Sequence, residues 1–180
     1  FYEIVWVAHR AAARQAVLGE INKSRNANGA AGDRELVKNI VRIATHMGAC
    51  STNRKIIGVT TKSGFKKSTW KDAPLLLDHK DLSVYKADFE TDFLTATRAY
   101  YEAQAQNWVA QGSAALYLER ATAALAHERA LLTECLIPES SAALVSVCQD
   151  AILRGPERSH LAFILESATG VGYMLNNDKF

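Results

Sequence analysis

Five histidines are the first residues to consider for chemistry, because imidazole binds metal ions and transfers protons near neutral pH. No two of them have the i, i+4 spacing that places a pair of metal ligands on one face of a helix. His127 is followed by Glu128, but adjacent side chains on a helix point apart. We therefore interpret this pair as part of a solvated helix face. The five residues are His9, His46, His79, His127 and His160.

Patterns for nucleophilic catalysis and phosphate binding are missing from the sequence. There is no nucleophile elbow and no GxGxxG loop, and Gly58–Gly64 (GVTTKSG) lacks the ending of a P-loop. Asp88 and Asp92 are one helical turn apart, and we expect them to be exposed and to repel each other mildly. A general acid and base need a cleft instead. We therefore predict no enzyme, and we assign no catalytic, cofactor-binding or metal-binding residue and no cofactor.

The cysteines indicate a reducing compartment. Cys50, Cys135 and Cys148 are odd in number and widely spaced, which argues against a zinc site or a disulfide framework. We expect reduced and mostly buried thiols in a cytoplasmic protein, a nuclear protein or both. No apolar run approaches the roughly 18 residues of a membrane span, and the net charge of +2 is too small to favour nucleic acid or membrane as a partner.

The strongest candidate interaction site is a basic segment, Asn53–Asp72. Its cations and aromatic rings can hold single-stranded nucleic acid or an acidic partner. We favour a solvated insertion instead, because no recognised nucleic-acid motif accompanies the charge. The segment falls within Ala49–Asp81, which we predict to be an inserted loop. The residues concerned are Arg54, Lys55, Lys62, Lys66, Lys67 and Lys71, with Phe65 and Trp70 interleaved.

Helical periodicity dominates the rest of the chain. Ile4–Lys23 predicts a helix whose apolar stripe comprises Ile4, Val7, Ala11, Arg14, Val17, Leu18 and Ile21. Asp33 can cap a second helix that ends at Gly48. Its apolar stripe comprises Leu36, Val37, Ile40, Ile43, Ala44 and Met47.

A third helix begins at Asp81 or Ser83 and carries a single aromatic stripe. Such a stripe needs a partner surface, so we interpret it as core packing rather than a ligand site. Its residues are Tyr85, Phe89, Phe93, Thr97, Tyr100 or Tyr101, and Trp108.

Gly112 breaks the chain after this helix, and Ser113 can cap the next one. That fourth helix carries a heptad-like seam at Leu118, Leu125, Leu132 and Leu136. The third and fourth helices would form an antiparallel hairpin.

Shorter helices follow the hairpin. Pro138 ends the fourth helix, and Ala143–Leu153 and His160–Ser167 predict two more, separated at Gly155. The chain then loosens over Ala168–Gly172. Because no alternating strand pattern is convincing, the fold class is all-α, a bundle of long antiparallel helices. We predict one module over residues 1–180, a fragment of a longer protein, with an inserted loop at 49–81.

The ordered series of these motifs resembles the N-terminal helical repeats of the cullin family. That family carries a phrase of the form VYxxDFExxFL, which Val84–Leu94 matches, and Tyr100 and Tyr101 follow on the same helix. Thr169–Lys179 (TGVGYMLNNDK) is similar to a phrase of the cullin-3 branch, and a cysteine at position 135 suits that branch. The resemblance covers nearly the whole chain outside the loop at 49–81.

The resemblance implies a scaffold segment of a cullin–RING ubiquitin ligase, a rigid spacer between substrate adaptor and RING subunit. In the cullin-3 branch the adaptor is a BTB-domain protein, which docks mainly on a first repeat of which this chain would hold only the end, at Phe1–Val7. The RING-binding domain would also lie elsewhere. Partner-binding residues therefore stay unknown, and neither membrane nor nucleic acid is expected as a partner.

Two other functions stay open. One is a helical interaction module that binds nucleic acid or an acidic partner through the basic segment at 53–72. The other is an unrelated helical-repeat scaffold of a different complex.

Overall fold

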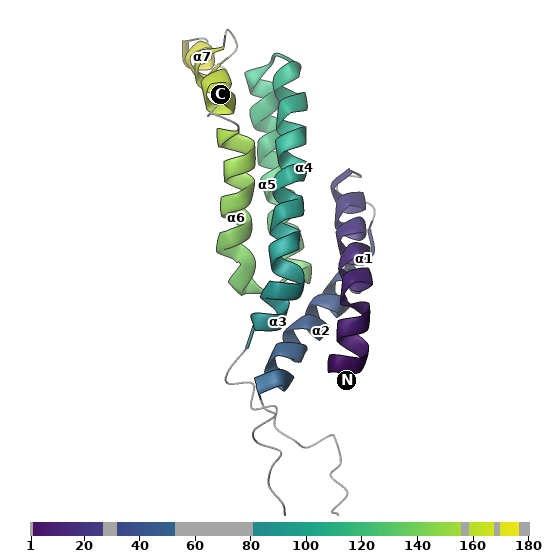
Figure 1. Cartoon of the computed structure of the whole chain (residues 1–180). Coiled ribbons are helices and arrows are strands. Elements are labelled where there is room, and N and C mark those ends of the chain that lie inside the picture. Colours follow the sequence, from purple (N-terminus) through teal and green to yellow (C-terminus); the bar gives the residue numbers. More distant parts are fainter. Residues whose placement is uncertain (1, 27–31, 53–80, 156–158, 168–169, 177–180) are drawn as a thin grey trace, which may run out of the picture.

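A computed structural model describes residues 2–26, 32–52, 81–155, 159–167 and 170–176, and these residues form helices and short connections without a strand (Figure 1). The all-α prediction is confirmed. Two long antiparallel helices, α4 and α5, form the centre of the bundle. The α-helices are α1 (Val7–Asn26), α2 (Arg34–Thr52), α3 (Ser83–Tyr85), α4 (Thr91–Ala110), α5 (Ala114–Cys135), α6 (Ser141–Gln149), α7 (Ser159–Glu166) and α8 (Val171–Asn176).

Within the described ranges, helical turns of two other types, π-helical and 3₁₀, adjoin these α-helices. The π-helical turns η1 (Tyr2–Trp6), η3 (Lys86–Glu90) and η5 (Asp150–Arg154) are continuous with α1, α4 and α6. A 3₁₀ turn, η4 (Pro138–Ser140), precedes α6. Helix α6 lies along one side of the α4–α5 hairpin, and α1 and α2 lie against its other side near one end (Figure 1).

Local capping signals place the starts of α2 and α5 as predicted. The carboxylate of Asp33 accepts a hydrogen bond from the backbone N–H of Leu36 at 2.9 Å. Before the third helix, Asp81 accepts from the N–H of Ser83, also at 2.9 Å, but Leu82 occupies the N-cap position of α3 and neither Asp81 nor Ser83 does. The hydroxyl of Ser113 caps α5 through the N–H of Leu116. These short polar side chains therefore satisfy N–H groups that have no partner within their own helix.

The aromatic stripe of the third helix lies in the core, as predicted. Tyr85, Phe89 and Phe93 are at most 2% exposed, and the rings of Phe89 and Phe93 stack with centroids 5.6 Å apart. Tyr101 is also buried, whereas Trp108 is half-buried. Each fully buried side chain of this size contributes roughly 1.5–3 kcal/mol of transfer free energy, so this stripe anchors the hairpin against its neighbours.

The predicted stripe of α1 is confirmed at its C-terminal end but wrong at its N-terminal end. Val17 and Ile21 are buried, but Val7 and Ala11 are exposed, and Ile4 is 81% exposed. The buried face of this segment instead comprises Trp6, Val17, Ile21, Ser24 and Arg25. At the N-terminal end the buried position is Trp6, whose indole N–H donates to Asp88, so Val7 and Ala11 lie off this face.

The seam predicted for α5 lies beside the buried face rather than on it. Leu118, Leu125, Leu132 and Leu136 are only partly buried and lie at the edge of the core. The buried residues of α5 are Ala114, Tyr117, Ala121, Glu128, Leu131 and Cys135. Ala114 and Ala121 are small and allow neighbouring helices to come close, and Glu128 lies on the same buried face. The spacing of the leucines therefore does not mark the buried face of α5.

Two predicted helix ends also differ. Helix α2 runs to Thr52, past Gly48, so the predicted loop starts within a helix. A glycine costs only about 1 kcal/mol in a helix interior, which favourable neighbours can offset. The predicted helix Ala143–Leu153 begins at Ser141 and ends through η5 at Gly155, whose φ is 59°. The basic segment Asn53–Asp72 lies outside the described residues.

Candidate functional site

A buried ion pair joins the end of α1 to the middle of α5. The guanidinium of Arg25 donates to both carboxylate oxygens of Glu128, at 2.7 Å through Nε and 3.1 Å through its Nη2 atom. The same Nη2 atom also donates to the hydroxyl of Thr97 in α4 at 2.7 Å. The side chains of Arg25 and Glu128 are 1% and 3% exposed. Two parallel hydrogen bonds fix the geometry of both charged groups, so α1, α4 and α5 meet at this point.

Aromatic rings surround the same guanidinium. Its central carbon lies 5.9, 5.2 and 5.5 Å from the ring centroids of Phe93, Tyr100 and Tyr101. The hydroxyl of Tyr101 donates to an oxygen of Glu128 at 2.7 Å. Ring faces attract a cation, and the carboxylate balances its charge. The cluster therefore compensates a charge that would otherwise destabilise the core.

The pKa values of this cluster follow from burial and from the glutamate. Burial alone would lower the pKa of Arg25, but the hydrogen bonds and charge of Glu128 outweigh it and raise that pKa above its ordinary value. Burial, followed by the charge of Glu128 and its hydrogen bond, raises the pKa of Tyr101 well above its usual range. The tyrosine hydroxyl therefore stays a hydrogen-bond donor at physiological pH.

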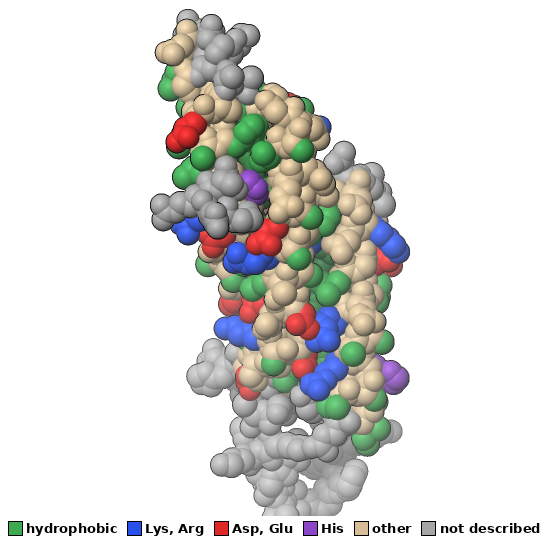
Figure 2. Space-filling model, turned by 45° about the horizontal axis from the view of Figure 1, so that its top comes forward, with side chains coloured by type: hydrophobic (Ala, Val, Ile, Leu, Met, Phe, Trp, Pro, Cys, Tyr) green, Lys and Arg blue, Asp and Glu red, His purple; other side chains and the backbone are tan. Residues whose placement is uncertain are grey.

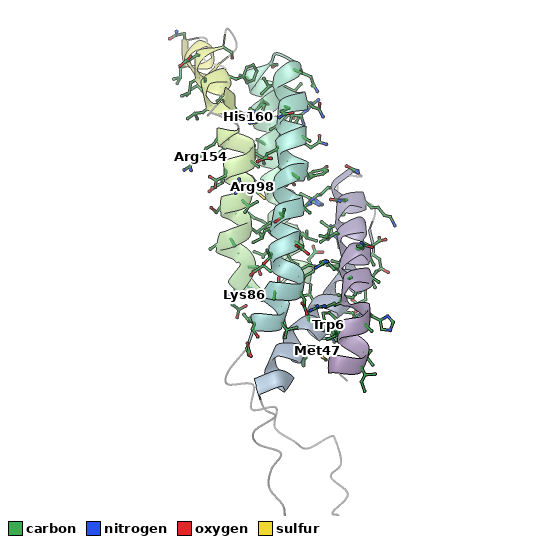
Figure 3. The ribbon with its side chains drawn as sticks, in the orientation of Figure 1. Trp6, Met47, Lys86, Arg98, Arg154 and His160 are labelled. Carbon is green, nitrogen blue, oxygen red and sulfur yellow. The ribbon has the colours of Figure 1, made fainter. Side chains whose placement is uncertain are left out.

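A second polar contact ties α1 to the start of the hairpin. Asp88 in η3 accepts from the indole N–H of Trp6 at 2.8 Å and from Arg10 at 2.7 Å. Its side chain is 9% exposed, so the prediction of an exposed aspartate is wrong. Asp92 pairs with Arg14 one turn further along both helices. Trp6 lies between α1 and this end of the hairpin (Figure 3).

A third buried carboxylate belongs to Glu90 in the same π-helical turn. It accepts from the hydroxyl of Ser140 at 2.5 Å, and Ser140 also lies 2.9 Å from the hydroxyl of Tyr85. Burial raises the pKa of Tyr85 to about 12. This chain of three side chains joins the start of the hairpin to the turn before α6. Sequence patterns singled out Tyr85 for its ring, but they gave no sign of its contact with Ser140 and Glu90.

Charged side chains elsewhere on the surface also pair across helices. Arg34 in α2 contacts Glu134 in α5, and Arg98 in α4 lies 3.9 Å from Asp150 in η5. Figure 2 shows basic and acidic side chains mixed over the face in view rather than gathered into a patch of one sign. Exposed pairs of this kind contribute about 1 kcal/mol or less to stability. The buried polar contacts therefore do more to hold the helices together.

The sequence candidates for chemistry do not come together. His9 is exposed, and His46 contacts the carbonyl of Arg42 on its own helix. His160 is buried against the carbonyl of Ile152 at 3.2 Å. Within the described ranges, no group of three or more His, Cys, Asp or Glu side chains is placed to hold a metal ion. His79 lies outside those ranges.

The interpretation of His127 and Glu128 as a solvated face is wrong. Glu128 is buried in its ion pair, and His127 is half-buried with a ring nitrogen 3.5 Å from the hydroxyl of Ser24. Cys135 and Cys148 are free and buried, as predicted for two of the thiols. Burial, with the charge of Glu128, raises the pKa of Cys148 to about 12, so this thiol is poorly suited to act as a nucleophile.

A groove opens beside the buried ion pair, where α1 ends against α4 and α5. Its volume is about 520 Å³. The buried side chains of Arg25 and Tyr101 line its inner part, and the other lining residues are half-buried apart from the exposed Asn26 and Ala123. The lining residues are Arg25, Asn26, Tyr100, Tyr101, Gln104, Trp108, Arg120, Ala123, Ala124 and His127.

A comparison with known protein families gives a match that spans the chain. The family described as "Cullin alpha solenoid domain" matches residues 1–180. The match includes the helices that carry the buried ion pair and the groove. In the part of the chain that the structure describes, no helix is long and apolar enough to cross a membrane.

Proposed function

This chain belongs to the cullin family, and on that premise we propose that it acts as a rigid spacer between the substrate adaptor and the RING subunit of a ubiquitin ligase. A scaffold role in ubiquitin ligases follows from the family, together with partners of two kinds, adaptors and RING proteins. The spacer would set the distance and orientation at which substrate lysines meet the conjugating enzyme. Its effect on rate would come from positioning.

The observation that carries this proposal is the buried pair of Arg25 and Glu128. Two helices joined only by apolar contacts can slide or tilt, because such contacts have no preferred direction. A two-pronged ion pair with buried hydrogen bonds permits one arrangement of α1 against α5. Asp88 holds the other end of α1 through Trp6 and Arg10. Fixing α1 at two points supports a rigid body rather than a flexible tether.

We further propose that the chain belongs to the cullin-3 branch and works with a BTB-domain adaptor. The support is the phrase at Thr169–Lys179 and the cysteine at position 135. Binding of the purified protein to BTB-domain adaptors, compared with adaptors of other cullin branches, tests this assignment. Selective binding to another adaptor class would contradict it.

We also propose a cytoplasmic or nuclear location, or both, because Cys135 and Cys148 are free and buried thiols. Imaging of the tagged protein in its source cells tests this. Residence in the secretory pathway would contradict it.

The spacer role can be tested in a reconstituted ligase that carries a substrate with lysines at several positions. A rigid spacer concentrates ubiquitin on few lysines. The double variant Arg25→Ala/Glu128→Ala removes both charges of the buried pair, so neither is left unpaired. We expect it to spread ubiquitin over more lysines and to slow the transfer.

A matched control removes the same two charges from an exposed pair. Arg34 and Glu134 also join α5 to a neighbouring helix, but their side chains are 36% and 47% exposed. The control is the double variant Arg34→Ala/Glu134→Ala. We expect it to keep the original lysine pattern. Hydrogen exchange of α1 reports whether each variant loosens the bundle. If α1 exchanges faster while the lysine pattern is unchanged, rigidity is not what the ligase requires.

A further inference from the structure

We propose that the groove between the end of α1, α4 and α5 binds a short acidic peptide segment of a partner protein. An apolar side chain of the peptide would pack on Trp108, and a neighbouring carboxylate would face Arg120 and His127. This site would be an additional interaction surface on the scaffold, and its existence does not depend on the spacer role.

The size and lining of the groove suit a peptide. Its volume of about 520 Å³ lies in the range of small ligand sites. Aromatic rings and alanines supply apolar contact, and Asn26 and Gln104 supply amide groups that can hydrogen-bond a peptide backbone. This mixture of apolar walls and a few polar groups is typical of binding sites.

The charges that line the groove are all of one sign. Arg25, in the inner part of the groove, is already neutralised by Glu128. Arg120 makes no ion pair within the described parts of the chain, although its side chain lines the wall. His127 adds an imidazole ring whose N–H can donate a hydrogen bond to a carboxylate. Because none of the lining residues is acidic, a carboxylate in the groove would meet attraction without a competing negative charge.

The aromatic walls are held in place before any ligand arrives. The ring of Trp108 meets Tyr117 edge-on with centroids 5.7 Å apart, and Tyr100 meets Tyr101 in the same way at 5.1 Å. The hydroxyl of Tyr100 also donates to Asn26 at 3.1 Å. Rigid side chains lose little entropy on binding, and this preorganisation favours affinity. A half-buried tryptophan is also the residue type most often found as a binding hot spot.

The charge pattern favours a peptide over a nucleic acid. A polyanion is held by a stripe of cations that follows its backbone over several phosphates. Here Arg120 is the one groove arginine without a carboxylate partner in the described ranges. One arginine and one histidine beside aromatic rings and alanines instead match one or two carboxylates that flank an apolar side chain.

Fluorescence anisotropy tests the proposal with a labelled peptide in which glutamates flank a single leucine. We expect binding that weakens with salt and that is lost when lysines replace the glutamates. Arg120→Glu should weaken binding by about tenfold or more. The matched control is Arg129→Glu, the same charge change at an exposed position of α5 that does not line the groove. It should change the affinity by less than about twofold.

A second pair of measurements tests the apolar contact. Trp108→Ala should weaken binding of the leucine peptide but should not weaken binding of a peptide in which glycine replaces the leucine. Arg120→Gln provides a milder change if Arg120→Glu loses helicity by circular dichroism.

Three results would overturn the proposal. One is no binding of the leucine peptide by the original protein, and another is equal weakening by Arg120→Glu and Arg129→Glu. The third is displacement of the peptide by single-stranded DNA at equal concentration, which would assign the groove to nucleic acid.

Discussion

Arg25 in α1 and Glu128 in α5 are 103 positions apart in sequence, yet they form a two-pronged ion pair in the core. The pair is surrounded by aromatic rings and by the hydroxyls of Thr97 and Tyr101. Taking two charges out of water costs several kcal/mol per ion, which their attraction offsets only when the geometry is good and the remaining hydrogen bonds are made. The arrangement meets both conditions. The pair therefore specifies how α1 docks on the hairpin.

Removal of one partner should be strongly destabilising. In Glu128→Ala, the guanidinium of Arg25 stays buried without a carboxylate, and Tyr101 loses its hydrogen-bond acceptor. We expect a loss of about 3–5 kcal/mol in the free energy of unfolding, measured by urea denaturation. The double variant Arg25→Met/Glu128→Leu, which leaves neither charge buried, should lose less. A loss below about 1 kcal/mol in Glu128→Ala would show that the pair has little effect on stability.

Asp88 and Asp92 should differ in their effect on stability, although they lie one turn apart. Asp88→Ala leaves the buried indole N–H of Trp6 without an acceptor and also removes the partner of the exposed Arg10, and we expect it to cost about 2–3 kcal/mol. Asp92→Ala removes a pair whose aspartate is 46% exposed, and it should cost less than about 1 kcal/mol. Thermal unfolding of the two variants side by side measures the difference. Equal losses would contradict the burial assigned to Asp88.

Local signals were sufficient to predict the long helices and the α4–α5 hairpin, although Gly48 does not end α2. Asp33, Ser113 and Gly112 act within a few residues of themselves, so their neighbours alone determine what they do. The stripe from Tyr85 to Phe93 was predictable because a run of large apolar side chains at helical spacing has one outcome, burial.

The charged contacts could not be predicted in the same way, because each partner lies on a different helix. A signal existed nonetheless: Arg25 continues the buried line of Val17 and Ile21, and Glu128 continues that of Tyr117 and Ala121. When each of two helices carries one charge on its otherwise apolar face, and the charges are opposite, the two residues are expected to pair. The groove was not predictable, because its walls come from three helices whose arrangement is fixed by these pairs.

Alkaline pH should destabilise the fold through buried hydroxyls and thiols. Burial raises the pKa of Tyr85 from 10.0 to about 12 and that of Cys148 from 9.0 to about 12. Both groups are neutral in the folded protein, so their full contribution to stability is present at a pH below the pKa values that they have in the unfolded chain. This contribution is lost as the pH rises through the pKa values that they have in the folded protein. The free energy of unfolding should therefore fall between about pH 9 and pH 12.

Tyr85→Phe tests the origin of this pH dependence. The variant has no phenol to ionise at this position, so its stability should fall less steeply than that of the original protein above pH 10.0. The difference should reach about 2 kcal/mol at the upper end of the range. Urea denaturation at several pH values measures both slopes. Parallel curves for the two proteins would contradict the assignment to Tyr85.

Gly155 and Gly112 both have a positive φ, but a side chain should be tolerated only at Gly112. A Cβ at Gly112 would meet nothing within 4 Å, whereas one at Gly155 would lie 2.4 Å from Nδ1 of the buried His160. Gly155 also has φ 59° and ψ −175°, a conformation that is essentially restricted to glycine. We expect Gly112→Asn to cost less than about 1 kcal/mol, because asparagine adopts positive φ at little cost. Gly155→Asn should cost about 3 kcal/mol or more. Urea denaturation of the two variants provides the comparison, and equal costs would show that α7 can move away from Gly155.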